Sequence, residues 1–239
     1  MRQIPFDLAL PPRFGVEDFL VAPANAEAYA AIERWPDWPG KVLVLVGPEG
    51  AGKTHLGSIW AEGAGAERVP GATLAQSAPE LFTDSNILLD DADALGGDEA
   101  ALFHRLNLLR ESGNGALLTA RTAPDSWGLR TADLLSRLRL APLVRVDEPD
   151  EALVQAVLVK LLADRQMVVE APVLAFLSLR MERSVGAARR LVAALDHASL
   201  AAGRRITRAI AADVLASLEA AAASSHGVVT GVGQNPPVP

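Results

Sequence analysis

A glycine-rich loop between an apolar run and a helix-forming segment is the feature that most constrains the fold. Residues 42–46 read Val-Leu-Val-Leu-Val, which is typical of a central parallel strand buried on both faces. The next residues, Gly47–Thr54, match the pattern GxxxxGK[ST]. Such glycines let backbone N–H groups point at an anion, and the following helix adds its positive end. The stretch predicts a phosphate-binding loop; the alternative is an ordinary strand-to-helix turn.

Two further groups of polar residues belong with this loop. Lys53 is expected to reach the β and γ phosphates as a point charge, and the Thr54 hydroxyl to ligate Mg²⁺. Ser85–Asp93 reads as an apolar strand that ends in two acids. Asp90 is expected to hold Mg²⁺, directly or through water, and Asp91 to lie near an attacking water. The alternative for these acids is a turn after an edge strand.

Strand patterns alternate with helix patterns over residues 41–146, which predicts an α/β fold with a parallel sheet. Strands are expected at 42–46, weakly within 66–76, and at 85–90, 115–120 and 142–146. Thr119 and Arg121 come at the carboxyl end of the 115–120 strand, where ligands bind in such sheets. A polar residue there either senses a γ-phosphate or caps the next turn. The helix over 98–112 is expected to turn Glu99, Asn107 and Arg110 toward water.

The strand patterns stop at Asp147, and four helices are expected beyond it: about 149–165, 172–181, one from Ser184 and one from Thr207. They predict a small all-α bundle after the α/β domain. After Leu218 an alanine and serine run leads into Gly227–Pro239, and residues 219–239 are expected to be disordered.

Composition limits the classes of function. The 239 residues include no cysteine, which excludes disulfides, thiolate metal sites and a cysteine nucleophile. No signal peptide or membrane-span pattern is visible, so a cytoplasmic location without membrane contact is expected. The formal net charge is −7. Stand-alone, sequence-specific DNA binding is therefore not expected, and protein partners fit the charge better.

The N-terminal residues allow two interpretations. In Gln3–Leu8 a glutamine precedes apolar side chains at alternate positions, Ile4, Phe6 and Leu8, and prolines follow. Such a peptide is either a hook for a hydrophobic groove or a strap packed on its own domain, and the residues alone favour the strap. Further on, Asn25 is a favourable N-cap for a helix that begins at Ala26.

The order of these motifs resembles the AAA+ family, whose members join a P-loop α/β domain to a helical lid. Gly50–Leu56, Leu88–Ala92 and Asp133–Leu138 are similar to segments of DnaA and its truncated relatives. The resemblance implies ADP or ATP with Mg²⁺ as cofactors, and it makes Arg137 an arginine finger that acts on a neighbour's γ-phosphate. It assigns the base pocket to Phe19, Leu20 and Val21. The other implied nucleotide contacts are Gly47, Gly50, Ala51, Gly52, Lys53, Thr54, His55 and Thr119.

Within this branch the chain is most similar to the Hda-type regulators, which lack a DNA-binding domain after the lid and carry an N-terminal clamp-binding peptide. That resemblance implies that the N-terminal peptide binds the DNA polymerase sliding clamp through Gln3, Ile4, Phe6 and Leu8. It implies a clamp-tethered protein that stimulates ATP hydrolysis by DnaA and so restrains replication initiation. The implied domains are a peptide over 1–12, a base domain over 13–146, a lid over 147–218 and a tail.

One position departs from this family's pattern. The sensor 2 arginine is expected near the start of the helix at Ser184, where the chain has Gly186, and Arg183, Arg189 or Arg190 is its candidate substitute. Without it, the chain's own ATPase activity is expected to be weak at most. The alternatives are an autonomous ATPase of the helicase-loader type, working in a homo-oligomer, and a non-catalytic adaptor.

Overall fold

The computed structural model describes residues 19–76, 85–95, 98–202 and 205–226. They form two compact units. The first contains the described residues up to Leu153 together with Arg183–Gly186, and the second contains Val154–Glu182 and the described residues from Ala187 onward. The proposed clamp peptide, Gln3–Leu8, lies outside the described residues.

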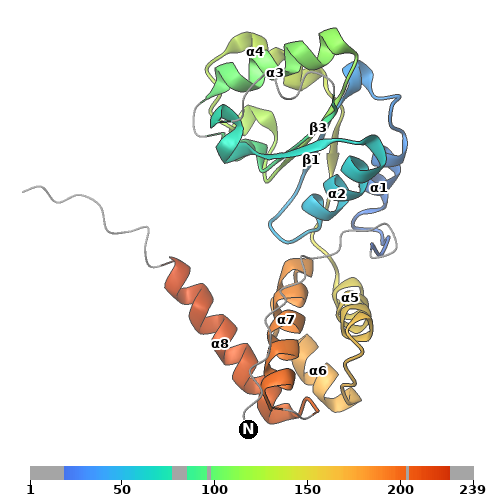
Figure 1. Ribbon diagram of the computed structural model, residues 1–239, viewed down its shortest axis with the longest axis vertical. Coiled ribbons are helices and arrows are strands. Elements are labelled where there is room, and N and C mark those ends of the chain that lie inside the picture. Colours follow the sequence, from blue (N-terminus) through green and yellow to red (C-terminus); the bar gives the residue numbers. More distant parts are fainter. Residues whose placement is uncertain (1–18, 77–84, 96–97, 203–204, 227–239) are drawn as a thin grey trace, which may run out of the picture. The chain divides into compact units, whose positions relative to one another are not determined.

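The first unit is built on a five-stranded parallel sheet in the order β2-β3-β4-β1-β5, which confirms the predicted fold class (Figure 1). The weakly predicted second strand is present but short. Its apolar content is low, and a 3₁₀ turn at Gly71–Gln76 follows it. The strand bounds are β1 Val42–Val46, β2 Glu67–Pro70, β3 Ile87–Asp90, β4 Ala116–Ala120 and β5 Leu143–Arg145.

Helices cover both faces of this sheet because its central strands are apolar on both sides (Figure 1). α1 (Ala26–Glu33) and α2 (Lys53–Ala64) pack on one face through Ile32, Leu56 and Trp60. α3 (Glu99–Ser112) and α4 (Ala132–Leu140) pack on the other. The sheet is thus held between two apolar layers, which fixes the carboxyl ends of β1, β3, β4 and β5 relative to one another.

The second unit is helical, as the lid pattern predicted. α5 (Glu151–Asp164) supplies its first residues to the first unit and the rest to this one, with α6 (Ala171–Arg180), α7 (Val185–Ala202) and α8 (Arg208–His226). Leu158, Leu177 and Leu195 lie fully buried in its core. Among the described helices, none is long and apolar enough to span a membrane.

The end of α8 corrects one expectation. Residues 219–226 continue the helix to His226 instead of starting a disordered tail. The reason is local: four consecutive alanines, Ala220–Ala223, have the highest helix propensity of any residue type and extend a helix that is already nucleated. Residues 227–239 lie outside the described part of the chain.

Candidate functional site

The loop after β1 has a backbone shape that requires its glycines. A Cβ on Gly47 would lie 2.1 Å from the carbonyl oxygen of Val146, so only glycine fits between β1 and the end of β5. Gly50 and Gly52 have φ angles of +75° and +106°, a region that L-residues with side chains rarely adopt. The shape of the loop thus explains why glycine occupies these three positions.

Residues at the start of α7 contact the same loop within the first unit. The Val185 N–H donates to the carbonyl of Gly50 at 3.0 Å, and a Cβ on Gly50 would lie 2.6 Å from the Cβ of Ser184. Gly186, at the position expected for sensor 2, therefore belongs to a segment packed directly against the glycine loop. A bulky side chain at Gly50 would separate these two segments.

Lys53 is the buried cation of the loop. Its side chain is only slightly exposed, and Nζ donates to the carbonyl oxygens of Gly47 and Pro48, each at 2.8 Å. Burial lowers the pKa of Lys53, while the carboxylates of Asp91, Asp93 and Asp90 oppose this shift. The ammonium group is therefore held against the inner side of the loop, with its charge only partly compensated.

A hydroxyl and carboxylate cluster lies at the ends of β3 and β4. Asp90 Oδ1 accepts hydrogen bonds from the hydroxyls of Thr54, at 3.2 Å, and Thr119. The Thr119 oxygen in turn accepts the Asp91 N–H at 3.0 Å. Thr119 is fully buried and bonded to the Asp90 carboxylate and to the Asp91 backbone N–H, so it positions the end of β3; its own contact with a nucleotide stays a prediction.

Asp91 occupies an unusual backbone and electrostatic position. Its φ angle is +53°, in the left-handed region that aspartate and asparagine tolerate better than most residues. Burial, and then the neighbouring Asp90 carboxylate, raise the pKa of Asp91, while Lys53 opposes the shift. The folded protein therefore holds a proton on Asp91 more tightly than the unfolded chain does.

We expect Asp91→Asn to stabilise the protein at neutral pH by roughly 0.5 kcal/mol. The gain is small because the side chain loses only part of its hydration, and the remaining solvent screens its charge. A raised carboxyl pKa makes ionisation costly in the folded state. That cost is present above the folded-state pKa and absent below the ordinary value of 3.8. Urea unfolding at pH about 7 and about 3 measures both limits, and the gain should vanish at the lower pH. An equal gain at both would assign the effect to the backbone instead of to charge.

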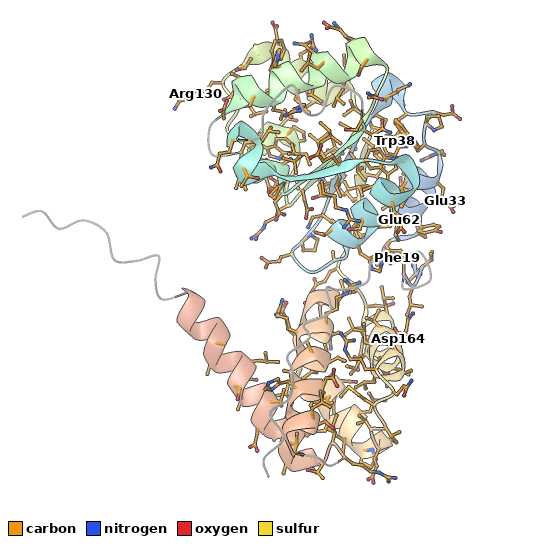
Figure 2. The ribbon with its side chains drawn as sticks, viewed as in Figure 1. Phe19, Glu33, Trp38, Glu62, Arg130 and Asp164 are labelled. Atoms are coloured by element: carbon orange, nitrogen blue, oxygen red, sulfur yellow. The ribbon has the colours of Figure 1, made fainter. Side chains whose placement is uncertain are left out.

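The segment expected to hold a base packs beside the loop. Phe19, labelled in Figure 2, stacks on Tyr29 with ring centroids 5.7 Å apart and meets the buried His55 edge-on at 5.1 Å. A Cβ on Gly52 would lie 3.9 Å from the Phe19 ring. Phe19 and His55 thus line one side of the loop, Leu20 is partly buried, and Val21 is 54% exposed.

Asn25 supports this segment in a way that the sequence did not predict. Its side chain makes no capping bond to α1. Instead, Oδ1 accepts the Ala22 N–H at 2.8 Å and Nδ2 donates to the Leu20 carbonyl at 3.0 Å. The residue is buried and braces the turn that carries Leu20 and Val21.

Arg137, the expected arginine finger, lies on α4 and is held by α3. Its Nη1 donates to Asn107 Oδ1, and the guanidinium lies over the Phe103 ring, 4.8 Å from the centroid. Glu99 accepts the N–H groups of Arg130 and Thr131, just before α4, at 2.7 and 2.6 Å. Arg110 is exposed and Glu99 and Asn107 are partly exposed, as expected, but these last two side chains also bind α4 or its N-terminal approach.

The three arginines considered as substitutes for sensor 2 have different settings. Arg183 pairs with Glu151 at 3.5 Å and is largely exposed, as is Arg190, which pairs with Glu182 at 3.4 Å. Arg183 belongs to the first unit, whereas Arg189 and Arg190 belong to the second. Substitution for the missing arginine stays a prediction for all three.

Sequence reasoning missed two acids at the site. Glu49, inside the loop, pairs with Arg121 at 2.8 Å, and Asp93 Oδ2 accepts the Arg121 N–H at 2.9 Å. The sequence does contain a signal for the Glu49 pair. β1 and β4 are neighbouring strands, and the acid follows β1 while the arginine follows β4 directly.

Curated relatives of the chain are initiators of chromosome replication. The chain is 29% identical over 217 residues to the chromosomal replication initiator protein DnaA of Thermomicrobium roseum, covering 77% of this chain and 46% of that protein. With DnaA of Thermus thermophilus it shares 26% identity over 237 residues, 87% of this chain and 54% of that protein. The chain thus spans about half the length of these relatives. No protein-family model matches it.

Solved structures give the same fold. Domain III of the Thermotoga maritima replication initiation protein DnaA superposes with a TM-score of 0.73 at 21% identity, covering 87% of this chain and 97% of that one. AMPPCP-bound DnaA from Aquifex aeolicus superposes with a TM-score of 0.63 at 20% identity, over 76% of this chain and 64% of that one. The chain is therefore related to DnaA and has the AAA+ fold of DnaA domain III.

Proposed function

We propose that the chain binds ADP or ATP with Mg²⁺ at Gly47–Thr54. The observation that carries this proposal is the convergence of Lys53, Thr54 and Asp90 at one edge of a parallel sheet, beside a loop whose backbone needs glycine. In this arrangement the loop N–H groups and the α2 N-terminus bind phosphate oxygens. Lys53 exchanges its two backbone acceptors for the phosphates, which are stronger partners for an ammonium group.

The residues at this edge suit Mg²⁺. The Thr54 hydroxyl oxygen and Asp90 Oδ1 lie 3.2 Å apart, and both are hard oxygen donors. Mg²⁺ in nucleotide sites takes one or two protein ligands and completes its shell with water and phosphate oxygens. Thr54 and Asp90 are therefore the residues that would hold the ion, which would neutralise phosphate charge. The Thr119 hydroxyl donates to Asp90 Oδ1 and so holds this carboxylate in place.

We further propose that the protein acts on DnaA, by presenting Arg137 to ATP bound there. Arg137 is supported by contacts with α3, to Asn107 and Phe103, and not by the residues that surround Lys53. A partly exposed guanidinium on α4 that is not bonded to the groups around its own phosphate-binding loop suits action across a subunit boundary. Its charge would stabilise the transferring phosphoryl group on the partner.

A tether to the DNA-loaded sliding clamp completes the proposal. The peptide Gln3–Leu8 would bind a groove of the clamp through its glutamine and its alternate apolar side chains, Ile4, Phe6 and Leu8. Tethering raises the effective concentration of Arg137 near DnaA on the same DNA and accelerates hydrolysis without any new catalytic group. The consequence would be fewer ATP-bound initiators and therefore less frequent initiation.

Released phosphate in a reconstituted mixture tests this function. We expect hydrolysis by ATP-charged DnaA to rise when this protein and clamp loaded on DNA are both present. Deleting Gln3–Leu8 should lower that rate by about 100-fold at submicromolar protein, because the tether is lost. The deletion should leave nucleotide affinity unchanged. Unchanged clamp capture by the deleted protein would return the segment to a structural role.

Autonomous ATPase activity, as in a helicase loader, is the second candidate, and one observation favours it. Asp91 directly follows Asp90 at the end of β3, and its N–H is held by the Thr119 hydroxyl, which places an acid where it could accept a proton from water beside the phosphates. ATP hydrolysis by this protein alone, without DnaA, would support this second function over the first. Nucleotide and clamp binding without stimulated hydrolysis would instead select a non-catalytic adaptor.

A further inference from the structure

Two arginines of the second unit lie over the same aromatic ring. Phe176 and Arg180 are one turn apart on α6, and Arg208 is the first residue of α8, which packs against α6. The Cζ atoms of Arg180 and Arg208 lie 4.3 and 4.9 Å from the centroid of the Phe176 ring. The two guanidinium groups therefore cannot be farther apart than these two distances combined. Phe176 is half-buried against the core of the unit, whereas both arginines are exposed.

No carboxylate of the described residues forms an ion pair with either guanidinium. The ion pairs described within this unit instead join Lys160, Arg165 and Arg190 to acidic partners of their own. α6 contains no acidic residue, and none occurs between Asp196 and Asp213 in the sequence. Two like charges thus lie close together in a chain whose formal net charge is −7.

An apolar side chain lies beside the two charges. Leu179 directly precedes Arg180 on α6 and is 75% exposed. It lies three residues after Phe176, and residues at this spacing are neighbours on a helix surface. Guanidinium forks bind carboxylates or phosphates at two points, and an exposed leucine gains from contact with another apolar group. The surface therefore fits a ligand that carries negative charges and an apolar group. We call this surface the arginine patch: Phe176, Leu179, Arg180 and Arg208.

We infer that the arginine patch is a docking site for an acidic segment of a partner protein. In an extended segment, side chains two residues apart point to the same side and lie roughly 6.5 Å apart. Two such carboxylates fit two guanidinium groups held this close together. An apolar side chain two residues further on would contact Leu179. The Phe176 ring holds both guanidinium groups before binding, which lowers the entropy cost of ordering them.

A polypeptide fits the arginine patch better than nucleic acid does. The net charge of the chain repels a long polyanion, whereas a short segment with two carboxylates carries little charge to repel. Sequence-independent binding of single strands also uses aromatic rings on which bases stack. The Phe176 ring is already covered by guanidinium groups. The inference is independent of the proposed nucleotide binding, because none of its residues belongs to the unit that contains the glycine loop.

Fluorescence anisotropy with the full chain and a labelled peptide tests this inference. The acidic probe contains Glu-Ser-Glu-Ser-Leu between glycines, and its counterpart has glutamine in place of both glutamates. Wild-type protein should bind the acidic probe about 10-fold more tightly than the counterpart. Arg180→Ala and Arg208→Ala should each weaken binding of the acidic probe by about fivefold, and the double variant by about 20-fold. Raising the ionic strength from about 0.01 M to about 1 M should remove most of the binding, because the Debye length falls from about 30 Å to about 3 Å.

Arg190→Ala is the matched control. Arg190 is an exposed arginine of the same unit, but it pairs with Glu182, so its loss should leave the affinity for the acidic probe unchanged. Equal binding of the acidic and glutamine probes, or full affinity in the double alanine variant, would overturn the inference. Stronger displacement of the probe by single-stranded oligothymidylate than by unlabelled acidic peptide, at equal negative charge, would also overturn it. Should the double alanine variant not fold, the double lysine variant decides, because lysine keeps the charge and loses the fork; undiminished affinity there would overturn the role of the guanidinium groups.

Discussion

Replacing Arg137 with alanine is expected to lower the rate of ATP hydrolysis on DnaA by about 10³-fold in a mixture that contains this protein and DNA-loaded clamp. The physical reason is that a guanidinium stabilises charge that develops on the transferring phosphoryl group, and alanine supplies none. Affinity of this chain for its own nucleotide should not change, because Arg137 contacts Asn107 and Phe103 on α3. Phosphate release, measured beside calorimetry, separates the two effects.

Three further variants define what the arginine does. Arg139→Ala removes a guanidinium from the same helix, two residues on, and should leave stimulation intact. Arg137→Lys keeps the charge but loses the fork geometry, so most of the stimulation should be lost. Asn107→Ala frees the side chain from α3 and should lower stimulation by about tenfold through loss of positioning. Full stimulation by Arg137→Ala would remove this residue from the mechanism and favour the adaptor function.

Much of the fold was predictable because a strand that is buried on both faces appears in the sequence as a run of apolar residues. A central parallel strand touches helices on both faces, so Val42–Val46 and Ala116–Ala120 consist mostly of apolar residues. The loop motif was equally informative. A Cβ at Gly47 would clash with the backbone, and Gly50 and Gly52 have positive φ angles that favour glycine. Few other residue types fit at such positions, so the sequence pattern alone identifies them.

Polar contacts between separate elements were not predictable for a different reason. Helical periodicity assigns a side chain to the outer face of α3, but it does not say whether water or another helix lies there. Glu99 and Asn107 sit on that face and bind the approach to α4 and Arg137. Asn25 has the right type and place for a helix cap, yet its amide bonds to the preceding turn because that turn offers both a donor and an acceptor.

Lys53 tests the nucleotide site most directly. Lys53→Ala is expected to weaken binding of both ADP and ATP analogues by about 100-fold or more, because it removes a charge that would be buried against the phosphates. Thermal or urea unfolding measures the same loss of affinity as a smaller stabilisation by added nucleotide. At nucleotide concentrations near 100 times the dissociation constant, ligand stabilises the wild-type protein by about 2.7 kcal/mol. With a 100-fold weaker site the gain falls to about 0.4 kcal/mol.

The nucleotide-free protein should respond much less to this change. Burial lowers the pKa of Lys53, which means that the folded state pays to keep the ammonium group charged, and two carbonyl hydrogen bonds offset that cost. Lys53→Ala removes the cost of burying the charge together with both hydrogen bonds, so the free energy of unfolding should change by about 1 kcal/mol or less. Lys160→Ala, which breaks the partly exposed pair with Asp164, controls for loss of a lysine charge. Because Lys53 is expected to bind the phosphates of both nucleotides, an affinity loss confined to triphosphate in Lys53→Ala would contradict this role.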